Sequence, residues 1–265
     1  ITNSTTISST KSYSDNPAEI VLDLMLNALN IPESEIDIAE FYNTKTKCSS
    51  YGYTCNVSFN AQTNIQSLIR DVLSTCRGQI VYSQGLWKMK LDEKEKTAVS
   101  ILTEDDILNK SLNVSMKGFQ EIANKIEVKY IEPSDEWLSA IVSSTDSDLV
   151  DNDGQEIVKT LDIKAVTSST QASKLSEITL NTMRYTEDSN GNRIKQTPLS
   201  ISFATSIKNA ELEVGDLIGL DHSLLDRTRY FIILSVESDQ SGAIQVSARE
   251  YCETHFKDSN GDYII

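Results

Sequence analysis

Carboxylates are the chemistry-bearing side chains that this sequence holds in excess. The chain has 39 Asp and Glu residues against 24 Lys and Arg residues, which gives a formal net charge of −15 at pH 7. Eight of the acids and no basic residue fall between Glu132 and Glu156. A glycosidase needs two carboxyl groups, one with its pKa raised in an apolar cleft. The Ser, Asn and Gly around these acids favour an exposed loop or loose hairpin, so we expect no catalytic pair there.

Three acidic turns carry oxygen ligands at alternate positions, as calcium-binding loops do. The turn that begins at Asp258 starts like an EF-type loop, but the chain ends before a twelfth-position Glu could follow. Asp-Gly and Asn-Gly are also preferred hairpin turns, and we favour that explanation over a metal site. The calcium candidates that stay open are Asp151, Asp153, Asp258, Asn260 and Asp262, with Asp146 and Asp148 in the third turn.

Nucleophilic and zinc chemistry have little support in the sequence. The two histidines are His222, expected in a surface loop, and His255, and no G-x-S-x-G elbow is present. Four cysteines form neither a C-x-x-C pair nor a Cys/His cluster. Cys76 falls on an apolar helix face and is expected to be a buried thiol, whereas Cys48 and Cys55 are close enough for a disulfide that the sequence does not decide. We therefore predict no catalytic residue, cofactor or metal.

The overall charge narrows the classes of partner. A nucleic-acid-binding surface or a surface for anionic membrane needs clustered basic residues, which a chain of net charge −15 does not favour. No apolar run approaches the ~20 residues of a membrane span. The densest, Tyr230–Val236, has the length of a strand. The chain starts at Ile1 without a signal-like segment, so we expect it to be part of a longer polypeptide.

The elements that would position these side chains are organised around Thr54–Leu91. Ile65, Leu68, Ile69, Val72, Leu73 and Cys76 recur at helical period, and Arg77-Gly78 is a typical helix end. The stretch therefore predicts a βαββ unit. Its parts are a strand at Thr54–Phe59, a helix capped by Thr63, and hairpin strands at Gln79–Tyr82 and Leu86–Leu91.

Helices are also indicated on both sides of this unit. Asn16-Pro17 begins one, with Asn as N-cap and Pro at the first position, and Pro32 closes it. Ser34–Tyr42 is expected to be a short second helix. Thr170–Tyr185 is expected to be a longer one, with Ala172, Leu175, Ile178 and Met183 facing inward.

Strands dominate the rest of the chain, and from Pro198 onward their short, regular spacing predicts a barrel or sandwich. Thr103 begins a capping box on a single turn that ends at Asp106. Turns are expected at Asp188–Asn192 and Asp239–Gly242. The predicted strands are Val99–Leu102, Ser111–Lys117, Lys125–Tyr130, Val158–Ile163, Leu199–Phe203, Leu217–Leu220, Tyr230–Glu237 and Ala243–Arg249.

Six short motifs follow one another along the chain: NPAEIVLDLMLN from Asn16, CNVSFNAQTNIQSLIRDVLSTCRG from Cys55, NKIEVKYIEP from Asn124, TSSTQASKLSEITLNTMRY with Gln171-Ala172, LEVGDLI from Leu212 and AREY from Ala248. Taken in this order, they resemble the tail tip protein J, or tail hub, family of lambda-like long-tailed phages. The resemblance extends over roughly residues 15 to 252. Each motif also has a structural reason: Gly215 permits a tight turn and Asp216 can bond its backbone.

The resemblance implies an α+β fold in which a small mixed domain joins an antiparallel β-barrel of the tail hub type. The mixed domain would span 15–124 and contain the βαββ core. The barrel domain would span 125–265, with strands at about 125–131 and 157–252, an acidic loop at 132–156 and a helix at 170–185. Residues 1–14 would be an extended segment, a candidate strand of a missing N-terminal barrel.

The resemblance also implies a structural role in a phage or prophage virion. A hub of this family is a homotrimer that caps the tail tube and links it to host-recognition parts. Its partners would be further copies of itself, tail tube or distal tail proteins and the tape-measure protein, with no sequence-specific nucleic acid. It would be made in the bacterial cytoplasm and act at the tail tip. Two alternatives stay open: a tail-associated glycan hydrolase, and a carbohydrate- or receptor-binding β module.

Overall fold

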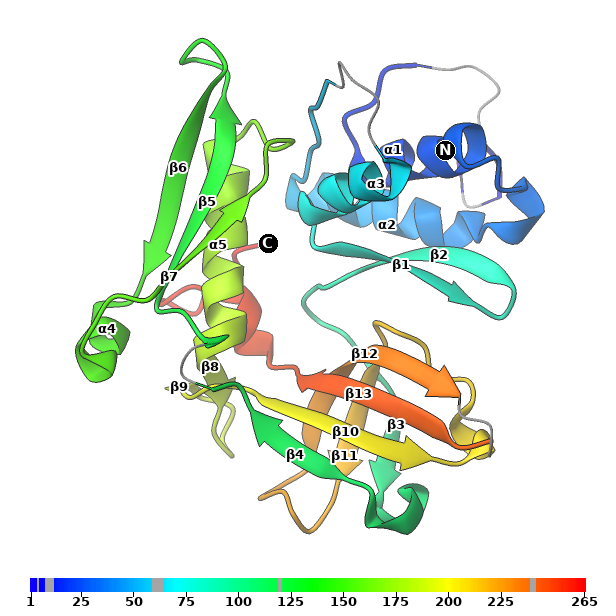
Figure 1. Ribbon diagram of the computed structural model, residues 1–265, viewed down its shortest axis with the longest axis vertical. Coiled ribbons are helices and arrows are strands. Elements are labelled where there is room, and N and C mark those ends of the chain that lie inside the picture. The colour runs from blue at the N-terminus through cyan, green and yellow to red at the C-terminus, as the bar shows by residue number, and fades with distance from the viewer. Residues whose placement is uncertain (4, 8–11, 59–63, 119–120, 239–241) are drawn as a thin grey trace.

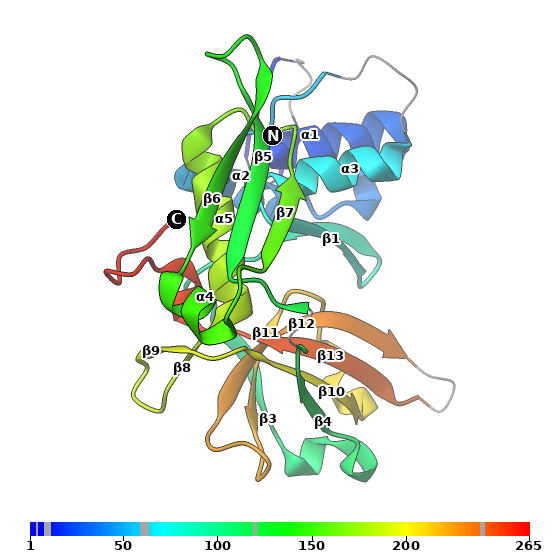
Figure 2. The ribbon, with the colours of Figure 1, turned by 60° about the vertical axis from the view of Figure 1, so that its left-hand side comes forward.

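The structure is a computed structural model that describes residues 1–3, 5–7, 12–58, 64–118, 121–238 and 242–265. Its elements form three parts (Figure 1), which are an N-terminal group of helices with a β-hairpin, a three-stranded sheet with one long helix, and a six-stranded sheet. Figure 2 shows the three-stranded sheet and the helical part side by side above the six-stranded sheet. Both α and β elements occur in each half of the chain, as the predicted α+β class requires.

In its described residues the helical part has three α-helices, each begun by a polar side chain that accepts a backbone N–H. Asn16 accepts from Ala18, Asp37 from Glu40 and Asn64 from Gln66. The elements are α1 (Pro17–Asp23) with a π turn (Leu24–Ala28), a 3₁₀ turn (Glu33–Glu35), α2 (Ile38–Tyr51), α3 (Ile65–Ser74) and the antiparallel hairpin β1 (Gly78–Ser83) and β2 (Leu86–Leu91). The predicted first helix, central helix and hairpin are thereby confirmed.

Two predictions in this part were wrong. The expected strand at Thr54–Phe59 is irregular over its described residues, 54–58. Its backbone bonds go to three separate places: Thr54 to Gln171, Cys55 to Asp15 and Asn56 to Ala165, so no single partner strand forms. The short helix expected at Ser34–Tyr42 is α2, which begins later and is longer. Thr63, predicted to cap α3, lies outside the described residues.

The second part is a sheet of order β6-β5-β7 whose inner face packs on α5. β5 pairs antiparallel with β6 and parallel with β7. The acidic segment 132–156, predicted as a loop or loose hairpin, holds the turn of a regular hairpin, all of β6 and the helix α4. The elements are β5 (Lys125–Glu132), β6 (Leu138–Thr145), α4 (Ser147–Asp153), β7 (Val158–Asp162) and α5 (Ser169–Arg184).

Strands from two distant stretches make up the six-stranded sheet, which has the order β3-β11-β12-β13-β10-β4. β3 and β11 are parallel, and the other neighbours are antiparallel. The strands are β3 (Ala98–Thr103), β4 (Asn113–Met116), β10 (Leu199–Thr205), β11 (Leu217–Asp221), β12 (Arg229–Ser238) and β13 (Ile244–Glu250). The connections include a small hairpin, β8 (Tyr185–Glu187) and β9 (Arg193–Lys195), and 3₁₀ turns at Glu104–Asp106, Leu108–Lys110, Ile207–Asn209 and Glu253–Phe256.

The predicted antiparallel β-barrel with strands at about 125–131 and 157–252 does not form, because in the described residues no sheet closes on itself. β5 cannot join the six-stranded sheet, since β6 and β7 occupy both of its edges. The places at the ends of that sheet are taken instead by β3 and β4, from the stretch before 125. Alternation located the strands correctly but carried no information on their partners.

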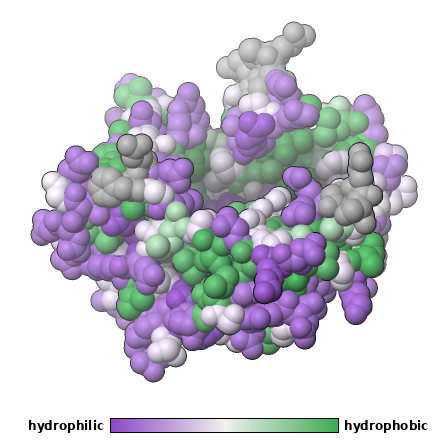
Figure 3. Space-filling model, turned by 60° about the horizontal axis from the view of Figure 1, so that its bottom comes forward, coloured by the Kyte–Doolittle hydropathy of each residue, from purple (hydrophilic) through white to green (hydrophobic). Residues whose placement is uncertain are grey.

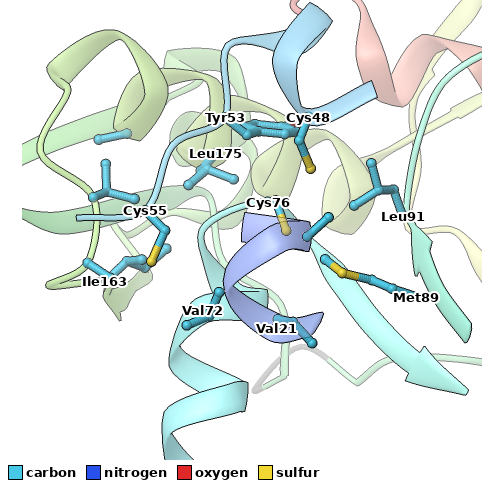
Figure 4. Packing of buried hydrophobic residues seen from close by; sticks show 14 of the residues in the cluster. Val21, Cys48, Tyr53, Cys55, Val72, Cys76, Met89, Leu91, Ile163 and Leu175 are labelled. Carbon is cyan, nitrogen blue, oxygen red and sulfur yellow. The ribbon is translucent and has the colours of Figure 1, made fainter. Parts of the chain in front are cut away.

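The apolar cores connect the three parts. The largest core combines the helical part with the three-stranded sheet (Figure 4), where Val21, Val72 and Met89 lie in one cluster with Leu175 of α5. A second core fills the curve of the six-stranded sheet, and a third packs Ile178 of α5 against its back. No helix in the described ranges is both long and apolar enough to cross a membrane.

A charged replacement of Val72 should abolish folding of the soluble protein. Its side chain is fully buried in the largest core, where an unpaired carboxylate costs several kcal/mol. We expect Val72→Asp to yield no soluble, cooperatively unfolding protein in expression and urea-denaturation experiments. Ser67→Asp, exposed on the same helix, is the control and should leave the denaturation midpoint nearly unchanged. Equal stability of the two variants would contradict the packing described here.

Candidate functional site

The three parts meet at one carboxylate, Asp92, which follows β2 directly. Arg249 of β13 donates from Nη2 to Asp92 Oδ2 at 3.1 Å, and Arg77 forms a second ion pair with the same oxygen. Arg77 also donates from Nη1 to Thr179 Oγ1 of α5 at 3.3 Å. The hairpin, the long helix and the six-stranded sheet are therefore joined through a single set of polar side chains.

The charges at this junction are fixed by their surroundings. Burial raises the pKa of Asp92, but the charges of Arg249 and Arg77 outweigh it and hold that pKa well below its usual range. His255, fully buried nearby, has its pKa lowered to about 3 by burial and by Arg249. Its Nε2 lies 2.9 Å from the Tyr185 carbonyl, which assigns the ring proton to Nε2. The junction thus contains an ionised carboxylate and a neutral imidazole at neutral pH.

A second polar contact joins the hairpin to the turn before β11. Lys88 lies 2.6 Å from Glu213, and Lys90 lies 2.8 Å from Glu213 and 2.7 Å from Asp216. Burial alone would raise the pKa of Glu213. Hydrogen bonds from Lys88 and Lys90 together outweigh burial and lower the pKa from its usual value to about 2. These side chains border a charged cavity of about 300 Å³ that also holds Lys96.

Gly215 makes this close approach possible. Its φ is +84°, a conformation that favours glycine, and an added Cβ would lie 2.4 Å from Gln79 Nε2. Asp216 Oδ2 accepts from the backbone N–H of Glu213 at 3.0 Å, which closes the turn. The roles predicted for Gly215 and Asp216 are confirmed. Contact with the hairpin was not predicted.

The acids of segment 146–156 serve as structural partners. Asp153 accepts from both Arg184 Nη1 and Nη2, at 2.8 and 3.0 Å, and from Asn124 Nδ2 at 2.9 Å. Asp146 begins α4 and pairs with Lys195 at 3.0 Å. Asp151 lies exposed on α4. The structure therefore separates the two acids of the proposed calcium turn, Asp151 and Asp153, into different surroundings.

In the acidic turn that begins at Asp258, a side-chain oxygen accepts hydrogen bonds from backbone N–H groups of the turn itself. Asp258 Oδ1 accepts from the backbone N–H groups of Asn260 and Asp262 at 2.8 and 2.9 Å. The backbone pairs Lys257 with Tyr263 across the turn. Within the described ranges no three His, Cys, Asp or Glu residues gather as a metal site would require. The calcium alternative stays a prediction that no contact here favours.

Carboxyl groups with the lowered pKa of an ion pair are poor general acids. Burial raises the pKa of Asp146, but hydrogen bonds from Tyr185 and Lys195 lower it below its usual value, and Arg184 lowers that of Asp153. Glu177 on α5 differs, because burial and the nearby Asp258 raise its pKa. Glu177 lines none of the cavities described here. Glu187 and Glu253 line a more apolar cavity beside β3, where Glu187 accepts from the Thr254 N–H and Glu253 accepts from Tyr251 Oη. Both carboxylates are thus engaged in structural hydrogen bonds.

The structure tests the burial predicted for His222 and for the cysteines. His222 lies in the turn after β11 with a side chain only 12% exposed, so it is more buried than a surface loop predicts, and its Nδ1 accepts from the Leu224 N–H. All four cysteines are buried free thiols, so Cys48 and Cys55 are not joined by a disulfide. The predicted burial of Cys76 is confirmed.

Two further cavities are more apolar than the first. One, of about 560 Å³, borders β3 and includes Ile101, Leu217 and Tyr230. The other, of about 420 Å³, lies between α3 and β1 beside Ile69, Leu73 and Ile80. Figure 3, seen from the side of the six-stranded sheet, shows apolar patches among hydrophilic residues and a hollow with a largely apolar wall. Neither cavity contains a convergent set of groups that would indicate catalysis.

Sequence reasoning missed the junction, although a local signal existed for part of it. Lys88 and Lys90 alternate within β2, which places both ammonium groups on one face of the hairpin and predicts an acidic partner. Arg77 was interpreted only as the cation of a helix end, and Arg249 only as part of a motif. The hairpin register places Arg77 opposite Asp92, one position beyond the Gly78–Leu91 pair, but nothing near Asp92 in sequence indicates that Arg249 would reach it.

Removal of the Asp92 charge should destabilise the whole chain. In Asp92→Asn the largely buried side chains of Arg77 and Arg249, 15% and 17% exposed, lose their shared anion, which costs up to about 3–5 kcal/mol for a fully buried pair. Urea denaturation should show this loss in the free energy of unfolding. The matched control is Asp162→Asn, whose pair with Lys164 is half-exposed at 3.7 Å and contributes at most about 1 kcal/mol. Equal effects of the two changes would contradict a central role for Asp92.

The Glu213 ion pairs should contribute to stability in a defined pH window. Because the folded pKa is lowered from 4.5 to about 2, the contribution is present above pH 4.5 and is lost as the pH falls towards 2. We expect the stability difference between the wild type and Glu213→Gln to shrink over that range in urea titrations. Glu237→Gln, exposed on β12, should show a small difference throughout. A Glu213→Gln difference that does not change between pH 6 and 2 would contradict the assignment.

One solved structure with a TM-score above 0.5 shares this fold. A chain of the "Virion of native gene transfer agent (GTA) particle" aligns with TM-score 0.66 and 16% identity over 91% of this chain, which spans 48% of that chain, or about half its length. A tail protein from Neisseria meningitidis MC58 aligns with TM-score 0.48 and 8% identity, and the alignment covers 75% of this chain and 58% of the Neisseria chain. The prophage tail protein gp18 from Listeria monocytogenes EGD-e aligns with TM-score 0.43 and 11% identity, and the alignment covers 74% of this chain and 56% of gp18.

The sequence itself also matches a family. No curated protein matches the chain. The family described as "Putative phage tail protein" matches residues 64–236, well over half of the 265 residues. That range extends from the start of α3 to β12 and includes Arg77, Asp92, Gly215 and Glu213. The chain that assembles its three parts around Asp92 belongs to the family of putative phage tail proteins.

Proposed function

We propose that the chain is a structural part of a tail tip, where it forms the hub that caps the tail tube and links it to host-recognition parts. The observation that carries this proposal is the shared fold, over 91% of the chain, with a component of an assembled gene transfer agent virion. Membership of a tail protein family supports a place in the tail. The hub assignment itself rests on the order of the six motifs from Asn16 to Tyr251.

The internal construction suits a scaffold. Two sets of buried ion pairs, around Asp92 and around Glu213, hold the hairpin against the six-stranded sheet. Polar contacts that are satisfied only in one arrangement favour a fixed orientation of the parts over a hinge. In the proposed assembly, copies form a homotrimer that contacts tail tube or distal tail proteins and the tape-measure protein. The net charge of −15 gives the surface little affinity for nucleic acid.

A non-catalytic role fits the carboxyl groups better than a glycan hydrolase does. The best-paired acids of the acidic segment, Asp146 and Asp153, have lowered pKa values and are committed to Lys195 and Arg184. A general acid needs the opposite shift. No described feature favours the carbohydrate-binding alternative.

Electron microscopy of labelled particles tests the proposal. Tail particles are purified with an epitope tag on the full-length protein that contains this chain. A hub predicts label at one end of the tail, at the tip, and threefold density in a reconstruction. Untagged particles are the control for background labelling. Label along the tail shaft or on the head would contradict the hub assignment, and clearing of cell-wall suspensions by the purified chain would favour the hydrolase.

A further inference from the structure

The outer edge of β6, together with the turn residue Trp137, forms a surface that we call the β6 edge. β6 is an end strand of its sheet, and in the described part of the chain its only strand partner is β5. The hairpin that carries it projects from the molecule at the upper left of Figure 1. Its eight residues, Leu138–Thr145, include no charged residue and no proline. Edge strands are normally protected by such residues or by a bulge, and β6 pairs with β5 in an unbroken register.

Large apolar side chains are exposed along the same edge. Trp137 is 65% exposed, Leu138 57% and Ile141 54%. Ile141 pairs with Lys129 on the outer face of the sheet, away from the core that holds Val128. An exposed tryptophan beside an unprotected strand has the composition of a binding hot spot rather than of an ordinary surface.

The turn that presents Trp137 is strained. Glu136 and Trp137 have φ of +52° and +62°, in the left-handed region that favours glycine, and the turn contains no glycine. Strain of this kind persists where a side chain has a use that glycine lacks. Here the turn places a bulky indole at the end of the β6 edge.

The charge around the β6 edge selects the partner. Asp135 and Glu136 are exposed at the turn, and among the described residues neither forms an ion pair. Four of the eight acids in segment 132–156 are paired with basic residues, namely Asp146, Asp148, Asp153 and Glu156, so the unpaired negative charge at the turn is that of Asp135 and Glu136. A second copy of this chain would bring the same negative charge, whereas a basic segment would be attracted.

We propose that the β6 edge docks an extended segment of another tail protein, which adds to the sheet as a fourth strand beside β6. The segment is uncharged where it faces Leu138–Thr145 and carries Lys or Arg at the end that meets Asp135 and Glu136. Main-chain hydrogen bonds along β6 supply affinity, and packing of Trp137 fixes the register. That the partner is a tail protein rests on the proposed function. The chemistry inferred for the β6 edge does not depend on the proposed function.

Peptide binding to the intact chain tests the chemistry directly. The probe is a synthetic peptide of alternating Thr and Val with paired Lys at both ends, and its counterpart has Glu in place of Lys. The Lys-capped peptide is expected to slow amide hydrogen exchange along β6 and to shift the fluorescence of Trp137 to shorter wavelength. The Glu-capped peptide should do neither. Equal binding of both peptides, or no protection of β6, overturns the proposal.

Two variants separate binding from folding. Trp137→Gly relieves the left-handed strain at a largely exposed site, so it should raise the thermal unfolding temperature yet weaken peptide binding by about tenfold or more. Ile141→Lys should keep the fold and should also weaken binding of the Lys-capped peptide. Leu224→Lys, 66% exposed outside the β6 edge, is the control and should bind as the wild type does. Unchanged binding by Trp137→Gly overturns the proposal.

The two proposals fail in different ways. If labelled particles place the protein away from the tail tip while the Lys-capped peptide still protects β6, the hub assignment fails and the docking edge stands. If label is found at the tip and β6 shows no protection with the Lys-capped peptide, the docking edge fails alone.

Discussion

A buried carboxylate is tolerable only where positive charge reaches it, and at Asp92 that charge comes from two separate parts of the chain. Arg77 follows the helix α3 and Arg249 belongs to β13. The Arg77 pair closes the open end of the β1–β2 hairpin, whereas Arg249 is paired only once the hairpin and the six-stranded sheet have docked. The junction therefore stabilises the assembled arrangement and penalises partly docked ones. The Lys88, Lys90 and Glu213 pairs repeat the same logic nearby. The relative placement of the parts, and hence every surface available to neighbours, depends on these contacts.

Local sequence signals predicted the elements well where a single period dominated. The four inward residues of the long helix, among them Leu175 and Ile178, are all buried in α5. The signals failed where neighbours decide the outcome. Alternation in 54–58 does not produce a strand because its backbone groups bond three different segments. The acids of 132–156 predicted an exposed loop or loose hairpin, but the uncharged Leu138–Thr145 within them is a regular strand, since β5 supplies its partner.

The same division applies to the candidate site. Gly215 and Asp216 could be assigned from the sequence because a turn is local, and its φ and backbone bond are set by adjacent residues. Arg249 and Asp92 are 157 positions apart, and only the tertiary fold brings them together. For the same reason the barrel was wrong: the strands were found, but the capture of β5 by β6 and β7 depends on long-range pairing.

The sheet order has a consequence for synthesis of the chain. β3 and β4 are made early, yet their partners β11 and β10 begin only at Leu217 and Leu199. At translation rates of ~5–20 residues per second, β4 waits on the order of 4–18 s as an unpaired, uncharged strand before β10 is complete. Contacts this distant also make folding slow. The nascent tail protein therefore passes through a period in which chaperones, or the crowding of identical chains on one messenger, decide between assembly and aggregation.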